Sequence, residues 1–423
     1  MHDRPTRVRF VVLGFLCSVT LLLYLDRMCI GKAAPYIQRE LKLSDGQMGF
    51  VHAAFMIAYG LFEVISGHWA DRHGARRVLT RIVIWWSLFT AITGWATSFW
   101  MLLVVRFLFG AGEAGALPNV TRIIDQWFPI SERGKIRGIV NLPALVGGMI
   151  APIATAFLIE WIGWRWAVHI YGALGLIWAS AFYCWFLDDP TEHPSINAAE
   201  LNLIGAPIKH DGSSRLPWRA ILANRNVWAM GGVMICGAST MSVIFSWYPT
   251  YLEGLHGVSN IQSGWWNAGI MFGGACGCVI GGWSADLANR KIASGRWKQS
   301  LVGGSAFAIA SVAMFFAYVV DDYRIKSVLL AVVCLGIHAH TAAWWTANSS
   351  ISGRHVSALF GLMNSMGVLG GATSQIAFGY LPRSQWPQAF LVGAAILATG
   401  MLCWVFVDPR KTILPSEKVV LSP

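Results

Sequence analysis

The stretch GHWADRHGARR, residues 67–77, lies between two long apolar runs of the chain. A shortened copy, GWSAD, occupies residues 282–286 and again ends an apolar run. Three positions of the two stretches match at a constant spacing of 215 residues, namely Gly67, Ala70 and Asp71 with Gly282, Ala285 and Asp286. A repeat at this spacing is what a duplication of one helical unit within the chain would produce.

The composition of the chain indicates that much of its surface faces lipid. Of its 423 residues, 55% are hydrophobic and 13% charged, and the mean hydropathy is +0.53, outside the range of ordinary soluble domains. Each spanning helix needs about 20 mostly apolar residues, and backbone pairing in lipid excludes open strands. We therefore predict an all-α integral membrane protein with about twelve spanning helices, near 8–30, 47–70, 78–97, 99–125, 134–157, 164–187, 226–250, 263–285, 299–320, 327–349, 357–380 and 386–407.

One polar, proline-containing stretch divides these runs into two sets of six. It contains DDPTEHPS and HDGSSR and is typical of a linker. We predict an N-terminal six-helix bundle over 1–187, a cytoplasmic linker over 188–225, a C-terminal six-helix bundle over 226–408 and a cytoplasmic tail over 409–423.

The net charge of +11 arises from lysines and arginines spread over many loops. If the N-terminus is cytoplasmic, 22 of the 32 fall on that side, seven on the other and three within spans. This bias predicts a multi-pass protein of the inner (plasma) membrane with both termini in the cytoplasm. The scattered charge gives no nucleic-acid surface, so the bilayer is the expected partner.

The loop stretch and several further motifs resemble the major facilitator superfamily, and within it the anion:cation symporter family. The further motifs are YLDR (24–27), RFLFGAGEAGALPN (106–119), WFPISERGKIRG (127–138) and LFGLMNSMGVLGG (359–371). The resemblance covers nearly the whole chain and implies the major facilitator fold and a monomer. It also implies a cytoplasmic gate whose residues would be Gly67, Asp71, Arg72, Gly74, Arg76, Arg77 and Asp286.

The same resemblance implies a function, because that family includes bacterial proton-coupled carriers of galactonate, glucarate and hexuronates. We expect proton-coupled uptake of a small organic anion by alternating access, with sugar acids first and aromatic carboxylates second. Sodium coupling stays open, as does the alternative of a proton-coupled exporter of drugs or metabolites.

Charged residues inside the predicted spans occur in the first half of the chain and are expected to carry the transport chemistry. Asp26 and Arg27 are adjacent and so point about 100° apart on a helix. A guanidinium offers a planar set of donors that suits a carboxylate, so Arg27 is the candidate for substrate binding. Asp26 and Glu113 are the candidates for proton coupling, with a static interhelical bridge as the alternative for Glu113.

Neutral and aromatic groups complete the predicted site. Arg106 lies two turns before Glu113 and resembles the superfamily's helix-four arginine, which supports the proton path. Where the galactonate-type relatives have a glutamine in helix five, this chain has Pro143, and Asn141 could substitute for the missing amide. The resemblance further assigns substrate contacts to Tyr24, Tyr59, Trp345 and Asn364, each of which could instead belong to the core.

Other classes of function lack their motifs. The chain has no HExxH, GxSxG or GxxxxGK[ST] sequence, so we expect neither an enzyme nor a nucleotide-driven pump. Its eight cysteines all fall in predicted spans without metal-ligand spacing, and we interpret them as packing residues. No cofactor and no metal are expected.

Overall fold

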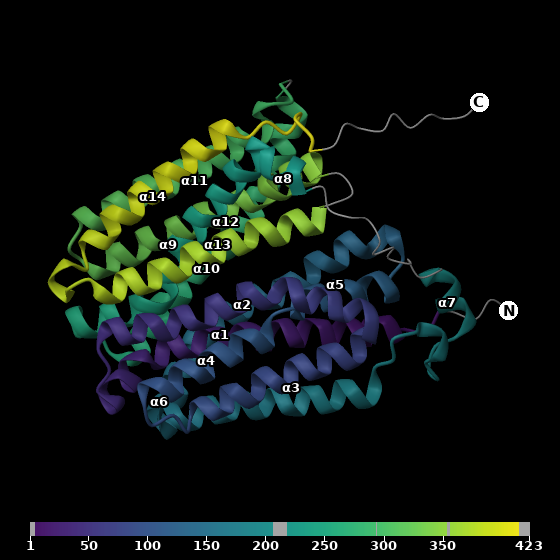
Figure 1. The fold of residues 1–423 in the computed structure, drawn as a ribbon, viewed down its shortest axis with the longest axis horizontal. Helices are drawn as coiled ribbons and strands as arrows, with labels where there is room; N and C mark the ends of the chain where they lie inside the picture. Colours follow the sequence, from purple (N-terminus) through teal and green to yellow (C-terminus); the bar gives the residue numbers. More distant parts are fainter. Residues whose placement is uncertain (1–4, 206–217, 293, 353–355, 414–423) are drawn as a thin grey trace. The chain divides into compact units, whose positions relative to one another are not determined.

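The computed structural model of the chain describes residues 5–205, 218–292, 294–352 and 356–413. The side chains of residues 64–73, 130, 134 and 356–358 lie outside this description. The described residues form helices joined by short loops and contain no strand (Figure 1). Eight of the described helical segments are long and apolar enough to cross a membrane. These features confirm the all-α membrane fold.

The chain divides into two compact units, which are described separately. The first contains residues 1–213, 245–268 and 375–380, and the second contains residues 214–244, 269–374 and 381–423. The units therefore follow the two sequence halves in large part, with short segments from the second half assigned to the first unit. The proposed six-helix halves stay a prediction.

In the first unit, α1 (Val8–Leu41) packs along α6 (Ile130–Trp185), which also packs against α3 (Ala75–Thr93). Helix α2 (Asp45–His73) packs along α4 (Phe99–Glu113). The core between these helices is built from aliphatic and aromatic side chains, among them the buried Trp86 and Phe109. The remaining elements are α5 (Ala116–Trp127), η1 (Pro190–Glu192) and α7 (Ala198–Ile204).

Two glycines shape this unit where the sequence predicts other boundaries. The predicted span 99–125 is interrupted at Gly115, whose φ of 91° ends α4 and starts α5. The predicted spans 134–157 and 164–187 follow each other within α6, with a kink at Gly163, where φ is 79°. Glycine adopts these left-handed values without the steric penalty of a side chain.

The second unit contains the helices of the second half. They are α8 (Trp218–Ala223), α9 (Arg225–His256), α10 (Asn260–Lys291), α11 (Trp297–Val319), α12 (Tyr323–Ser352), α13 (Val356–Tyr380), η3 (Arg383–Gln385) and α14 (Gln388–Phe406), with parts of α9, α10 and α13 in the first unit. Helix α11 packs against both α12 and α14. The eight cysteines are free thiols.

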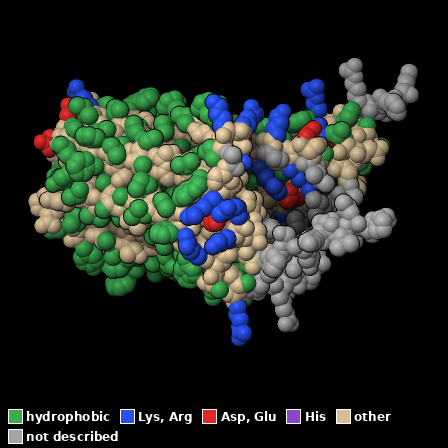
Figure 2. Space-filling view, turned by 90° about the horizontal axis from the view of Figure 1, so that it is seen from above, with side chains coloured by type: hydrophobic (Ala, Val, Ile, Leu, Met, Phe, Trp, Pro, Cys, Tyr) green, Lys and Arg blue, Asp and Glu red, His purple; other side chains and the backbone are tan. Residues whose placement is uncertain are grey.

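The surface follows the pattern expected of a membrane protein. Figure 2 shows hydrophobic side chains over most of the face in view, with lysines and arginines gathered toward one end. Exposed tryptophans such as Trp100, Trp161 and Trp166 add to this apolar surface. An extended apolar surface of this kind is typical of contact with a membrane.

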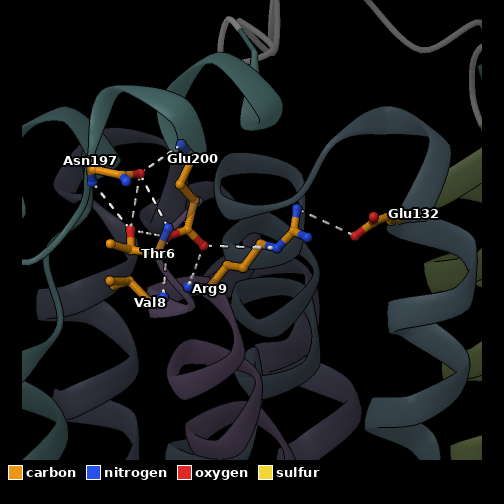
Figure 3. A network of polar contacts seen from close by, with 6 residues as sticks. All are labelled: Thr6, Val8, Arg9, Glu132, Asn197 and Glu200. Carbon is orange, nitrogen blue, oxygen red and sulfur yellow. Dashed lines mark hydrogen bonds and ion pairs between the residues drawn. The ribbon is translucent and has the colours of Figure 1, made fainter. Parts of the chain in front are cut away.

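Helix α7, within the predicted linker, docks onto the start of α1 (Figure 3). Helix α1 has no capping side chain of its own. Instead, Glu200 of α7 accepts hydrogen bonds from the backbone N–H groups of Val8 and Arg9, both at 3.2 Å. The carboxylate is fully buried and also accepts from the Thr6 hydroxyl. Arg9 in turn reaches Glu132 at the start of α6 at 3.6 Å (Figure 3).

Candidate functional site

An ion pair between α1 and α4 lies at the centre of the candidate site. The Arg27 Nε donates to a carboxylate oxygen of Glu113, and the Glu113 side chain is 1% exposed. The other Glu113 oxygen and one terminal nitrogen of Arg27 have no hydrogen-bond partner among the described residues. Arg27 is therefore held by a carboxylate through one side of its donor fork and retains donors for a second acceptor.

Three aromatic rings surround the Arg27 guanidinium. The rings of Tyr59, Phe55 and Tyr24 have their centroids 4.6, 5.5 and 5.8 Å from its central carbon. These distances favour cation–π attraction, which helps to hold the guanidinium in place beside Glu113. The structure thus brings the predicted residues Tyr24, Arg27, Tyr59 and Glu113 together. It adds Phe55, whose only sequence signal is its spacing of four residues from Tyr59.

Arg106 forms the second cation of the site. It is 2% exposed and lies over the rings of Phe109 and Phe55, at 4.2 and 5.5 Å from their centroids. Phe55 therefore lies within cation–π distance of both guanidinium groups. No ion pair joins Arg106 to Glu113 among the described residues, in agreement with their separation of two helical turns.

Asp26 is separated from its neighbour Arg27 and has a different environment. Asp26 is 1% exposed, and neither of its carboxylate oxygens has a hydrogen-bond partner among the described residues. Arg106 and Glu113 are the charged groups that act on it electrostatically. The side chains of Asp26 and Arg27 thus face different neighbours, as expected from their separation of about 100° around the helix.

Close helix packing around the site depends on glycine. A Cβ at Gly110 would lie 2.3 Å from the Phe55 carbonyl oxygen, and one at Gly112 would lie 1.8 Å from the Trp85 ring. The missing side chains let α2 and α3 approach α4 beside Glu113. Small residues at a helix interface permit this close approach of neighbouring backbones.

The predicted gate is partly described. The side chains of Gly67, Asp71 and Arg72 lie outside the described residues. Gly74 has a φ of 80°, and a Cβ there would lie 2.5 Å from a carboxylate oxygen of Asp188.

The same aspartate caps the following helix. The Asp188 carboxylate accepts a hydrogen bond of 2.8 Å from the Arg76 backbone N–H. The Arg76 side chain donates to the Tyr183 carbonyl and stacks on its ring, whereas Arg77 is exposed. Gly74 and Arg76 thereby fix the loop to the end of α6.

The remaining predicted residues lie on α6 and on helices of the second unit. Asn141 is exposed on α6, so its role as a substitute for the missing glutamine stays a prediction. In the second unit, Trp345 stacks on Phe360 with ring centroids 4.7 Å apart, and Asn364 is half-buried on α13. Asp286 is exposed on α10.

Comparison with known proteins places this chain in a family. The model of the Major Facilitator Superfamily matches residues 16–374. The chain belongs to this superfamily. It is therefore a membrane transporter and not an enzyme, and its helical fold is the one expected from the loop repeat.

Two relatives of similar length are described as transporters of anions. The chain is 30% identical to the probable sulfoacetate transporter SauU of Cupriavidus necator, with 97% of each chain covered. It is 26% identical to the D-galactonate transporter of Escherichia coli, with 96% of each covered. Its fold resembles that of a bacterial homologue of the human lysosomal transporter Spinster, with a TM-score of 0.72, 21% identity and 94% of each chain covered.

Proposed function

We propose that this transporter takes up a small organic anion together with protons, with a hydroxylated sugar acid as the first candidate and an aromatic carboxylate as the second. The named relatives are a probable sulfoacetate transporter and a D-galactonate transporter. Both compounds are small anions with a terminal carboxylate, and sulfoacetate has a sulfonate at its other end. We further propose the inner membrane as its location, with both termini in the cytoplasm.

The Arg27–Glu113 ion pair is the observation that carries this proposal. A guanidinium paired with a buried carboxylate has fewer donors and less net charge to offer an anion. Protonation of Glu113 removes its negative charge and frees the Nε donor of Arg27. The proton and the anion therefore favour each other's binding, which is the coupling that a symporter needs.

The ring arrangement favours a hydroxylated anion. Tyr24 and Tyr59 place phenol groups beside the cation that would hold the carboxylate. Phenol hydroxyls can both donate to and accept from substrate hydroxyls. A sugar acid uses the charge and these hydroxyls together, whereas sulfoacetate uses mainly the charge.

Reconstitution tests the substrate and the coupling ion together. Purified protein in proteoliposomes is offered labelled D-galactonate, D-glucarate, sulfoacetate and benzoate under an inward proton gradient or an inward sodium gradient. We expect concentrative uptake of at least one sugar acid with the proton gradient and none with sodium alone. Uptake driven by a sodium gradient would contradict the proposal. Export of preloaded anions driven by an inward proton gradient would contradict it as well.

The Arg27→Lys variant tests the binding residue. Lysine retains the charge but loses the planar fork, so we expect the apparent affinity for the transported anion to fall by about tenfold or more. Arg39→Lys is the matched control, because Arg39 is on the same helix and exposed. Unchanged affinity in Arg27→Lys would remove this residue from the binding site.

A further inference from the structure

The second unit has a groove between α10 and α11, with α12 at its base. A Cβ at Gly281 of α10 would lie 2.1 Å from the Ala339 carbonyl oxygen of α12. A Cβ at Gly336 of α12 would lie 2.5 Å from the Ala306 carbonyl oxygen of α11. Both outer helices therefore pack closely on α12, and the space between them is lined by Ile280 and Ser284 of α10, Leu301, Ser305 and Ile309 of α11, and Gly336 of α12.

The groove is open to the apolar surface of the unit. Leu301, Ile309 and Ile280 on its two walls are 53, 52 and 44% exposed. At its base, Gly336 and Ala339 are buried. Its volume of about 250 Å³ is smaller than that of most pockets for drug-sized ligands, about 300–1,000 Å³. A narrow apolar groove of this kind suits a flexible hydrocarbon chain.

Each wall of the groove leads to a lysine at the same end. On α11, Lys298 lies seven residues before Ser305, which places the two on one side of the helix. On α10, Lys291 lies seven residues after Ser284 and shares its side in the same way. The Lys298 ammonium donates to the Asn289 backbone carbonyl at 3.3 Å, so the end of α10 adjoins the start of α11.

The length of the groove matches one leaflet of a bilayer. Ile309 lies eleven residues after Lys298 on α11, and Ile280 lies eleven residues before Lys291 on α10. At a rise of about 1.5 Å per residue, each wall extends about 16 Å from its lysine. One leaflet contributes about half of the roughly 30 Å hydrocarbon core. The exposed Trp297, next to Lys298, is of the residue type that favours the headgroup level. The two lysines are thus expected among the headgroups, with the apolar walls beside one acyl chain.

The two lysines are available to an anionic group. Neither forms an ion pair with an acidic side chain in the part of the chain that the structure describes. Helix α11 contains no acidic residue. The one acidic residue of α10 is Asp286, five residues before Lys291 and so about 140° away around the helix. The end of the groove therefore has a positive charge that a phosphate would neutralise.

We propose that this groove is a binding site for one anionic phospholipid, whose acyl chain lies between α10 and α11 and whose phosphate is held by Lys291 and Lys298. Apolar contact alone would not distinguish one phospholipid from another, because their chains are alike. The paired lysines supply the distinction, since a lysine at the membrane surface is attracted to anionic headgroups. A zwitterionic lipid brings its own cation to the same place. The site does not depend on which anion or coupling ion is transported.

Native mass spectrometry of the purified full-length protein measures this binding. Protein in detergent is titrated with dioleoyl phosphatidylglycerol, dioleoyl phosphatidylcholine or glycerol phosphate, and the dissociation constant of the first bound molecule is determined. We expect one tight site for phosphatidylglycerol and weaker binding of phosphatidylcholine. Glycerol phosphate should not bind, because it has the charge and lacks the chains.

Three variants locate the site. Lys291→Gln/Lys298→Gln should weaken phosphatidylglycerol binding by roughly twentyfold or more, because each lysine near an anionic headgroup contributes about fivefold. Arg225→Gln/Arg290→Gln is the charge-matched control, since it removes two exposed positive charges of the same unit that do not line the groove. Ser305→Phe fills the groove from an exposed position and should weaken binding with both lysines in place.

Four results would overturn the proposal. Equal affinity for the two phospholipids would remove the selectivity, and wild-type affinity in the lysine variant or in Ser305→Phe would remove the site. Equal weakening in both double variants would show attraction to the overall charge instead of to this groove. Glycerol phosphate that binds as tightly as phosphatidylglycerol would assign the lysines to a free phosphate. A dimer that Ser305→Phe dissociates would assign the groove to a second copy of the chain.

Discussion

The charged residues of the site were predictable, whereas the side chains around them were not. Ionisable residues in an apolar run are conspicuous, so Asp26, Arg27, Arg106 and Glu113 can be identified from the sequence alone. Phe55 contributes a ring to both arginines, but its position depends on how α2 packs against α4. No sequence period distinguishes such a ring from an ordinary core residue.

Glu113 offers the sharpest prediction at the scale of one residue. The glutamine of Glu113→Gln cannot bind and release a proton. We therefore expect this variant to lose concentrative uptake, while exchange of labelled for unlabelled substrate continues. One coupled proton and a gradient of one pH unit support about tenfold accumulation, and this is the factor that the variant should lose. Both rates are measured in proteoliposomes, with the exposed Glu192→Gln as the control.

A variant that accumulates substrate as well as wild type would assign Glu113 to the alternative of a static bridge. Asp26 would then be the one remaining candidate of the two for coupling.

At the scale of elements, helix existence was predictable and helix ends were less so. The first span was expected to end near residue 30, yet α1 continues to Leu41. Lys32 makes this possible, because its ammonium is buried against Glu253 and Ser263 at 2.5 and 2.6 Å. Both partners are more than 200 residues away in sequence. A hydropathy average over neighbouring residues therefore cannot predict this contact.

The close approach of α2 to α4 is tested by Gly110→Ala. The added Cβ would meet a backbone oxygen of α2, which cannot move aside as a side chain can. We expect overpacking to cost about 1–3 kcal/mol and to lower the thermal unfolding midpoint and the uptake rate. Gly14→Ala is the control, because a Cβ there has no atom within 4 Å. Equal unfolding midpoints for Gly110→Ala and Gly14→Ala would show that α2 and α4 are not in close contact at this point.

The linker helix is tested by Glu200→Gln. The variant retains the shape of the cap and loses the negative charge at the positive end of α1, which is worth about 1–2 kcal/mol in partly buried settings. We expect faster hydrogen exchange at the first amides of α1 and a lower unfolding midpoint. Glu192→Gln should leave both unchanged, and protection of α1 equal to wild type in Glu200→Gln would contradict the capping role.

At the scale of the whole molecule, the number of protons decides how the membrane potential acts. If Asp26 and Glu113 each carry one proton with one monovalent anion, every cycle moves one net positive charge inward. An inside-negative potential of 100 mV then contributes about 2.3 kcal/mol, or roughly fiftyfold in accumulation at equilibrium. A one-proton cycle would be electroneutral.

Potassium and valinomycin impose that potential on proteoliposomes at a fixed pH gradient. Uptake of a monovalent substrate such as D-galactonate should rise when the interior becomes negative. An unchanged accumulation would rule out the two-proton cycle and leave coupling to a single carboxylate.

The cap on α1 also determines where the polypeptide could be divided in two. Glu200 and Asn197 bind the residues that begin the first helix, so they belong with that helix, although the sequence assigns them to the linker. A carrier expressed as separate fragments 1–205 and 206–423 would retain the cap within the first fragment. Division at residue 188 would transfer it to the second fragment. The first division is therefore the one from which two independently made pieces should reassemble into a working transporter.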